Sequence, residues 1–315
     1  MNYTLHQLQI FKEVVQQGSI TKASEVLNLT QPAVSIQLKN LEDQFGIPLT
    51  EKVGRGIHIT AFGLKMAEVF DRILLANDEV KHTINRHKGL LAGDIHIAVV
   101  STGKYVMPYL LSGFVAKHPE VKVTMDVTNK TQVVRSLEEN KTDFALVSVL
   151  PERIKLNIVP LMENHLFLVG NKERAESFSY EKSVKASLES LPMIFREQGS
   201  ATRAAMETYF NDNKIPHPRT LYLTSNEAVK QAVNAGLGYS IMPLIGLRNE
   251  LKSVDLKLIP MKGLPIITQW MLVYRKEKGL SPASQAFLNF IEQDKGDIIN
   301  KYFSWTKDIL RQIEP

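Results

Sequence analysis

The chain has 315 residues, with 38 Lys and Arg against 33 Asp and Glu, and no cysteine. This length predicts two or more domains, and the missing cysteines exclude disulfides, thiolate metal sites and thiol catalysis. The longest uncharged stretch, 231–247, contains three glycines and a proline, and the N-terminus has no basic flank, so we expect no membrane span or signal peptide and predict a cytoplasmic protein.

Three helices are predicted within residues 1–60. Apolar residues recur at helical spacing in three segments, which we expect to begin near Leu5, Thr21 and Thr30. The third segment opens with Thr30-Gln31-Pro32, in which the threonine caps the helix and the proline lies in its first turn. Two short helices, a tight turn and a longer helix are typical of a helix-turn-helix.

A hairpin and a long helix are predicted next. Two short extended runs, 49–52 and 57–60, flank Val53-Gly54-Arg55-Gly56 and predict a wing with a basic tip. Thr60 then caps a helix that reaches about Lys88, with apolar residues close to heptad spacing. Because one apolar stripe on a solvated helix has nothing of its own to cover it, we expect this helix to dimerise. The stripe consists of Met66, Val69, Ile73, Ala76, Val80 and Ile84.

From Asp94 onward, strand-like segments alternate with amphipathic helices. This alternation predicts an α/β fold with parallel sheets and right-handed crossovers, arranged as two Rossmann-like lobes with a cleft between them. The expected boundaries are 1–60 for the winged helix-turn-helix domain, 61–92 for the linker helix, 93–295 for the regulatory domain (lobe I 93–162 and 267–295, lobe II 163–266) and 296–315 for a short C-terminal helical tail.

The start of the third helix is the candidate DNA-reading surface. Exposed polar residues there read base edges in the major groove, and basic residues nearby contact phosphates or the minor groove. The alternative is an ordinary solvated helix face. Residues 1–88 carry 10 basic and 9 acidic residues, a net +1 of the total +5, so affinity has to come from a few placed residues. The candidates are Thr30, Gln31, Pro32, Ser35, Gln37, Lys39 and Arg55.

Hydroxyl and amide residues follow four strands of the lobes. Each cluster lies at a strand's carboxyl end and a helix N-terminus, where free backbone N–H groups and the helix dipole favour an anion. Each residue taken singly could be only a helix cap. Arg196 and Arg203 either neutralise the anion or pair with surface acids. The candidate effector-binding residues are Ser101, Thr102, Thr131, Arg196, Gly199, Ser200, Thr202 and Asn226.

Catalytic and cofactor motifs are missing from the sequence. The eight histidines are scattered, and no zinc-protease, nucleophile-elbow, Walker or dinucleotide pattern occurs. We therefore predict no enzyme activity, no metal and no cofactor beyond a small anionic effector. The competing interpretation is a cytoplasmic solute-binding protein or enzyme whose N-terminal domain only mediates oligomerisation.

Over nearly its full length the sequence resembles the LysR-type transcriptional regulators. The N-terminal half of the resemblance rests on Gly18-Ser19-Ile20, on Thr30-Gln31-Pro32-Ala33-Val34-Ser35 and on Thr60-x-x-Gly63. In the second half, the segment 196–203 is similar to a motif of the branch that includes regulators of carbon fixation and sulfur assimilation. The resemblance implies a winged helix, a linker helix and two lobes like those of type II periplasmic binding proteins, assembled as a homotetramer from dimers joined by the linker helix.

The sequence departs from the family pattern on the DNA-binding side. Thr50 and Lys52 stand where the family usually has Phe and Arg, and Ile36 stands where it often has arginine. The expected function is a sequence-specific DNA-binding transcriptional regulator controlled by a small anionic effector between the lobes, with double-stranded DNA, the effector and its own copies as partners. The sequence names neither the effector nor the target genes.

Overall fold

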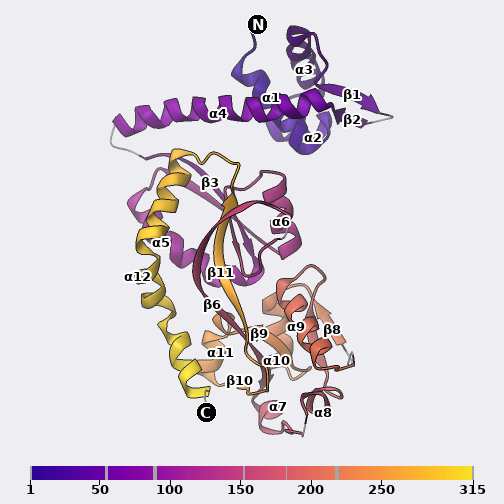
Figure 1. The fold of residues 1–315 in the computed structure, drawn as a ribbon, viewed down its shortest axis with the longest axis vertical. Helices are drawn as coiled ribbons and strands as arrows, with labels where there is room; N and C mark the ends of the chain where they lie inside the picture. The colour runs from indigo at the N-terminus through magenta and orange to yellow at the C-terminus, as the bar shows by residue number, and fades with distance from the viewer. Residues whose placement is uncertain are drawn as a thin grey trace. The chain divides into compact units, whose positions relative to one another are not determined.

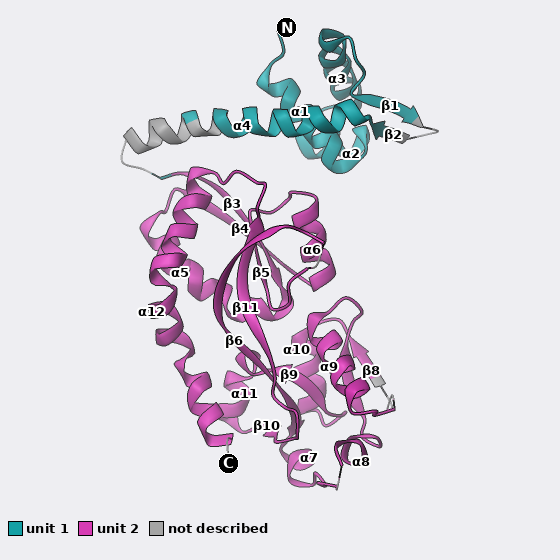
Figure 2. Ribbon diagram, viewed as in Figure 1, with its two compact units in different colours: residues 1–91 teal, residues 92–315 magenta. Residues whose placement is uncertain are grey.

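A computed structural model describes residues 2–53, 56–87, 91–151, 153–181, 183–216 and 220–313. The chain divides into two compact units, Met1–Leu91 and Ala92–Pro315 (Figure 2). Among the described residues, no helix is long and apolar enough to cross a membrane.

The first unit contains the predicted helix-turn-helix and wing (Figure 1). Its first three helices are capped by Thr4, Ser19 and Thr30, each of which has an extended backbone and accepts a main-chain N–H with its side chain. The second helix therefore begins just before the predicted Thr21, because Ser19 and not Thr21 is its cap. The elements are α1 (Leu5–Gln17), α2 (Ile20–Leu27), α3 (Gln31–Phe45), β1 (Thr50–Val53), β2 (Gly56–Ile59) and α4 (Ala61–His87).

One hydrophobic core joins α1, α2, α3 and the first half of α4. Phe70 and Leu74 of α4 are buried in it, and the Phe70 ring lies 5.8 Å from that of Phe11. The predicted stripe of α4 is therefore divided between two environments. Ile73 packs on this core, whereas Val80 is 60% exposed.

The start of α4 is packed tightly against the wing. Thr60 Oγ1 accepts the Gly63 N–H at 2.9 Å and donates to the Pro48 carbonyl at 2.9 Å, which confirms Thr60 as the cap. A side chain at Gly63 would collide with the carbonyl oxygen of Leu49, so this close approach requires glycine.

The second unit is built on a seven-stranded sheet in the order β10-β6-β11-β5-β3-β4, with β9 also paired to β6. As predicted, β3 is parallel to β4 and β5, and β7 is parallel to β8 in a separate pair. The prediction of wholly parallel sheets is wrong for β9, β10 and β11, which are antiparallel to β6. The strands are β3 (Gly93–Val100), β4 (Val121–Thr128), β5 (Phe144–Val147), β6 (Leu156–Asn171), β7 (Met193–Arg196), β8 (Thr220–Leu223), β9 (Ser240–Pro243), β10 (Leu256–Ile259) and β11 (Ile266–Arg275).

Two long antiparallel strands, β6 and β11, connect the two lobes of this unit. Lobe I surrounds β3, β4 and β5, and lobe II surrounds β7 to β10 (Figure 2). The register between β6 and β11 shifts next to Trp270, which is fully buried. The shorter helices are η1 (Ser101–Tyr105), α5 (Met107–Lys117), α6 (Lys130–Glu138), α7 (Lys172–Glu176), α8 (Val184–Leu188), α9 (Ala201–Asp212), α10 (Asn226–Asn234), η2 (Leu244–Gly246) and α11 (Arg248–Ser253).

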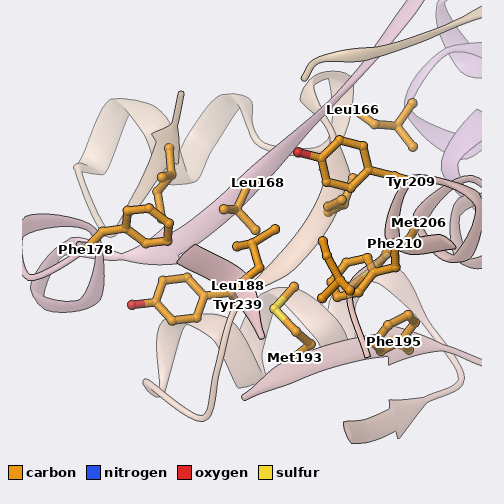
Figure 3. Close-up of a cluster of buried hydrophobic side chains, with 13 residues drawn as sticks. Leu166, Leu168, Phe178, Leu188, Met193, Phe195, Met206, Tyr209, Phe210 and Tyr239 are labelled. Atoms are coloured by element: carbon orange, nitrogen blue, oxygen red, sulfur yellow. The ribbon is translucent and has the colours of Figure 1, made fainter. Parts of the chain in front are cut away.

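Lobe II has its own core, in which side chains from β6, β7, α9 and the segment around α8 meet (Figure 3). Phe195 and Phe210 pack edge to face with ring centroids 5.7 Å apart, and Phe178 packs against Tyr239 at 5.8 Å. The contact between Phe195 and Phe210 holds β7 against α9, and so it fixes the position of the loop that joins the two elements.

The last helix, α12 (Pro282–Ile313), is continuous over 32 residues. Phe287 and Ile291 of its first half are buried, and Phe287 packs against Phe114 of lobe I. In its second half, Trp305 and Ile309 pack on a core cluster of lobe II. A separate C-terminal tail from residue 296 is therefore wrong, because these apolar contacts continue the same helix past Gly296.

Candidate functional site

The predicted reading residues lie on the face of α3 opposite its buried side. Gln31, Pro32 and Lys39 are exposed, and Ser35 is half-buried. The buried face consists of Val34, Leu38 and Leu41. The structure thus leaves the first turns of α3 free to enter a DNA groove. Arg55, at the predicted basic tip of the wing, lies outside the described residues.

Two of the predicted residues already have internal partners. The Thr30 side chain accepts the Ala33 N–H at 3.4 Å and so caps α3. The Gln7 side-chain amide donates to Gln37 Oε1 at 3.2 Å, and Gln7 itself is buried. This contact ties Gln37 to α1. The Gln37 amide oxygen is therefore in use, and the Gln37 amide N–H groups are the part of the side chain that could reach a base.

Sequence reasoning did not assign a role to the apolar residues on this surface. Ile36 is 58% exposed on α3, one residue from Ser35, and Val26 is 55% exposed on α2. An exposed isoleucine on a groove-facing helix can contact thymine methyl groups but cannot donate to a base.

Glu42 fixes the start of the wing relative to α3. Its Oε1 accepts the N–H groups of Leu49 and Thr50 at 2.9 and 2.8 Å and the Thr50 hydroxyl at 2.8 Å. Thr50, which stands where the family usually has Phe, therefore adds a side-chain hydrogen bond between the wing and α3.

In the second unit, five of the predicted effector residues converge on one small interlobe cavity. Ser101 and Thr102 reach it from η1 in lobe I, and Arg196, Ser200 and Thr202 reach it from the β7–α9 segment of lobe II. The cavity volume is about 10 Å³, room for about one water molecule. A larger ligand therefore requires the two walls to separate.

Arg196 is neutralised from within the protein. Its side chain is 3% exposed, its Nε and Nη2 donate to the two carboxylate oxygens of Glu197 at 2.8 and 2.9 Å, and its Nη1 donates to Asn226 Oδ1 at 2.5 Å. The Asn226 amide in turn donates to Ser101 Oγ at 3.4 Å. Asn226 thus does not line the cavity but connects the Arg196 guanidinium to lobe I.

Arg203 also has an acidic partner. Its Nε donates to Glu207 at 2.7 Å, and its guanidinium lies 4.7 Å from the ring of Tyr222. Both arginines therefore have a carboxylate partner within the protein.

Thr131 and Gly199 meet just outside the cavity. Gly199 has φ +85°, and a Cβ there would lie 2.6 Å from Thr131 Oγ1, so the two lobes touch at this point. Both residues line a groove of about 720 Å³ between α6 and α9, which shares Lys130 and Ser200 with the cavity. The groove and the cavity are therefore adjacent parts of one site.

Lys130 was missed by sequence reasoning and is the cation that both spaces share. It is half-buried, and no carboxylate of the described residues lies within 4.0 Å of its Nζ. The available signal was its position directly after Asn129, which caps α6. Opposite, the Ser200 hydroxyl makes no cap hydrogen bond, so it and the free N–H groups of the first turn of α9 remain available.

Comparisons with known proteins cover both units. Residues 5–64 match the model for bacterial regulatory helix-turn-helix proteins of the lysR family, and residues 88–295 match the LysR substrate binding domain. The chain is 36% identical over 293 residues to the HTH-type transcriptional activator CmpR of Synechocystis, covering 92% of this chain and 95% of CmpR. It is 35% identical to the RuBisCO operon transcriptional regulator of Allochromatium vinosum, over 92% of this chain and 96% of that protein.

Solved structures share the fold. The regulatory domain of Synechocystis CcmR in complex with 2-PG, 2-phosphoglycolate, is 33% identical with a TM-score of 0.58, covering 63% of this chain and 95% of that domain. Full-length CbnR complexed with its target DNA is 22% identical with a TM-score of 0.55, covering 92% of this chain and 99% of CbnR.

Proposed function

Since the chain belongs to the LysR-type transcriptional regulators, it is a DNA-binding regulator with an effector-binding domain, and we propose that its effector is a small phosphorylated carboxylate of the 2-phosphoglycolate kind. The observation that carries this proposal is the uncompensated Lys130 facing the first turn of α9 across the interlobe site. The competing interpretation as a solute-binding protein or enzyme is set aside, because both units match the domains of one family of regulators.

The chemistry of the site suits a ligand with two anionic groups. A phosphate fits the free N–H groups of α9 with Lys130 as its counter-charge, and hydroxyls from both lobes can donate to its oxygens. The carboxylate would then lie toward Ser101 and Thr102. CcmR, whose regulatory domain carries 2-phosphoglycolate, supports this class of ligand by its 33% identity. Because the cavity is small, the lobes have to separate and close again for the ligand to bind. The affinity for the ligand therefore depends on the angle between the lobes.

Titration calorimetry of 2-phosphoglycolate into the full chain tests the effector. We expect binding to weaken roughly tenfold in Lys130→Gln, as for loss of one charged hydrogen-bond partner. Lys122→Gln, an exposed lysine on β4 of the same lobe, is the matched control and should bind as wild type. Equal affinity in Lys130→Gln and wild type would contradict the assignment of Lys130 as the counter-charge of the phosphate.

On the DNA side, we infer that Gln31, Pro32, Ser35 and Lys39 contact the operator, with the Gln37 amide and Arg55 as further contacts. Two copies joined through α4 would cover the exposed Val80 and present two reading helices, and pairing of such dimers gives the homotetramer. The protein then acts in the cytoplasm, where its DNA is. Footprints of wild type and Gln31→Ala test the assignment, and an unchanged sequence preference in the variant would contradict it.

A further inference from the structure

A second crevice lies where both lobes meet the C-terminal half of α12. It has a volume of about 580 Å³, within the range of small-molecule sites, and it shares no lining residue with the interlobe cavity or its groove. Figure 1 shows the C-terminal half of α12 beside α11, which forms one wall. Three aromatic residues of this crevice, Tyr302, Phe303 and Trp305, lie beyond residues 88–295, the stretch that matches the family's substrate-binding domain.

The crevice carries an excess of positive charge. Buried Lys230 is bound to Glu227 at 3.0 Å and to Glu250 at 2.7 Å, and Lys104 lies 3.5 Å from Glu227. Two further cations on α11, Arg248 and Lys252, also line it and are exposed. No carboxylate of the described residues lies within 4.0 Å of either, so four cations face two carboxylates. This balance favours an anion.

Aromatic rings form much of the remaining wall. The Arg248 guanidinium lies 5.5 Å from the Trp305 ring, and Tyr109, 39% exposed, packs against Tyr302 with ring centroids 4.8 Å apart. Rings beside cations favour a ligand that has a planar ring as well as a negative charge.

One acceptor in the crevice lacks a donor. Glu250 Oε1 accepts from Lys230, but Oε2 is buried and has no hydrogen-bond partner among the described residues. A buried carboxylate oxygen left without a partner is costly, and a hydroxyl or amino group of a ligand would satisfy it.

We propose that this crevice is a second ligand site, which takes a nucleoside phosphate. The base packs against Trp305 and Tyr109, the phosphate binds Arg248 and Lys252, and a sugar hydroxyl donates to Glu250. The walls come from η1 and α5 of lobe I, from α10 and α11 of lobe II and from α12. A ligand bound in the crevice therefore changes the angle between the lobes. Its binding and the binding of the interlobe effector each alter the affinity for the other.

Tryptophan fluorescence of the full chain, titrated with adenosine 5′-monophosphate, tests the proposal. The chain has two tryptophans, and because Trp270 is fully buried, quenching reports on Trp305. We expect saturable quenching, and binding weakened roughly tenfold or more in the double variant R248Q/K252Q, which loses two charged partners of the phosphate. Inorganic phosphate and adenosine, each supplying half of the recognition, should bind much more weakly.

Two control variants distinguish binding in this crevice from binding elsewhere on the chain. Lys307→Gln removes an exposed cation of α12 outside the crevice and should bind as wild type. Lys130→Gln, in the interlobe site, should also bind as wild type, so a failure here is distinguishable from a failure of the proposed effector. Equal affinity in R248Q/K252Q and wild type, loss of affinity in Lys130→Gln instead, or quenching that does not saturate would each overturn the proposal.

Discussion

The buried pair of Arg196 and Glu197 makes a quantitative prediction about stability. Glu197→Ala leaves the Arg196 guanidinium, whose side chain is 3% exposed, with Asn226 as its remaining side-chain partner. Removing one partner of a fully buried ion pair costs about 3–5 kcal/mol. Because the Glu197 side chain is itself 20% exposed, water can reach the gap, and we expect about 2–3 kcal/mol.

Urea unfolding followed by tryptophan fluorescence measures this loss. Both tryptophans, Trp270 and Trp305, lie in the second unit, so the signal reports on that unit and not on the DNA-binding unit. In thermal unfolding followed by the same signal, the melting temperature should fall by roughly 5–10 °C for a unit of this size.

The matched control for this prediction is Glu207→Ala. Its partner Arg203 has a side chain that is 22% exposed, and the Glu207 side chain is 36% exposed, so we expect a loss below about 1 kcal/mol. If Glu197→Ala and Glu207→Ala destabilised the unit equally, the argument from burial would be refuted.

A second readout for Glu197→Ala is anion binding. Arg196 freed of Glu197 should bind 2-phosphoglycolate more tightly relative to wild type, and an unchanged affinity would show that the guanidinium does not face the ligand.

Four further predictions concern both units. Gly63→Ala should unfold the wing and abolish operator binding in gel shifts, because the new methyl group meets a main-chain carbonyl, whereas Gly296→Ala, with open space around it, should stabilise α12 by about 0.5–1 kcal/mol in urea unfolding. Ile36→Arg should change the footprint and steepen the salt dependence of binding by roughly one unit of log K per log salt, and an unchanged footprint would place Ile36 away from the bases. Burial lowers the pKa of His165 against the opposing effect of Glu163, so the second unit should lose stability as pH falls below about 6.5. His165→Gln should reduce that loss when unfolding is compared at pH 7.5 and 5.5.

Much of the site could be predicted because it depends on local rules. Hydroxyl residues after buried strands are brought to one edge by the topology, and Ser101, Thr102, Ser200 and Thr202 do meet there. The caps Thr30 and Thr60 follow from side-chain oxygens ahead of apolar periodicity. Neither inference requires knowledge of the distant partners.

What could not be predicted depends on side-chain geometry and on contacts between distant segments. In sequence, Arg196 and Lys130 are both cations near helix starts. Only the fold reveals that Glu197 neutralises Arg196, whereas no carboxylate of the described residues lies within 4.0 Å of Lys130 Nζ. The pattern Asp294-Lys295-Gly296 suggests a helix end, yet α12 continues because Trp305 and later residues pack on lobe II. Similarly, the antiparallel pairing of β6 depends on where the chain returns, from Val169↔Ser240 in β9 to Leu156↔Arg275 in β11.

The shared strands β6 and β11 have a consequence for how the second unit folds. β6 pairs with β11 from Leu156↔Arg275 to Leu166↔Ile266, and the same β6 carries β9 and β10 of lobe II. Neither lobe can complete its sheet before the chain has reached β11, so the polypeptide has to be synthesised as far as Arg275 first. High contact order of this kind slows folding and leaves strand edges open meanwhile. Residues 92–315 should therefore melt calorimetrically as one transition, and neither lobe expressed alone should be stable.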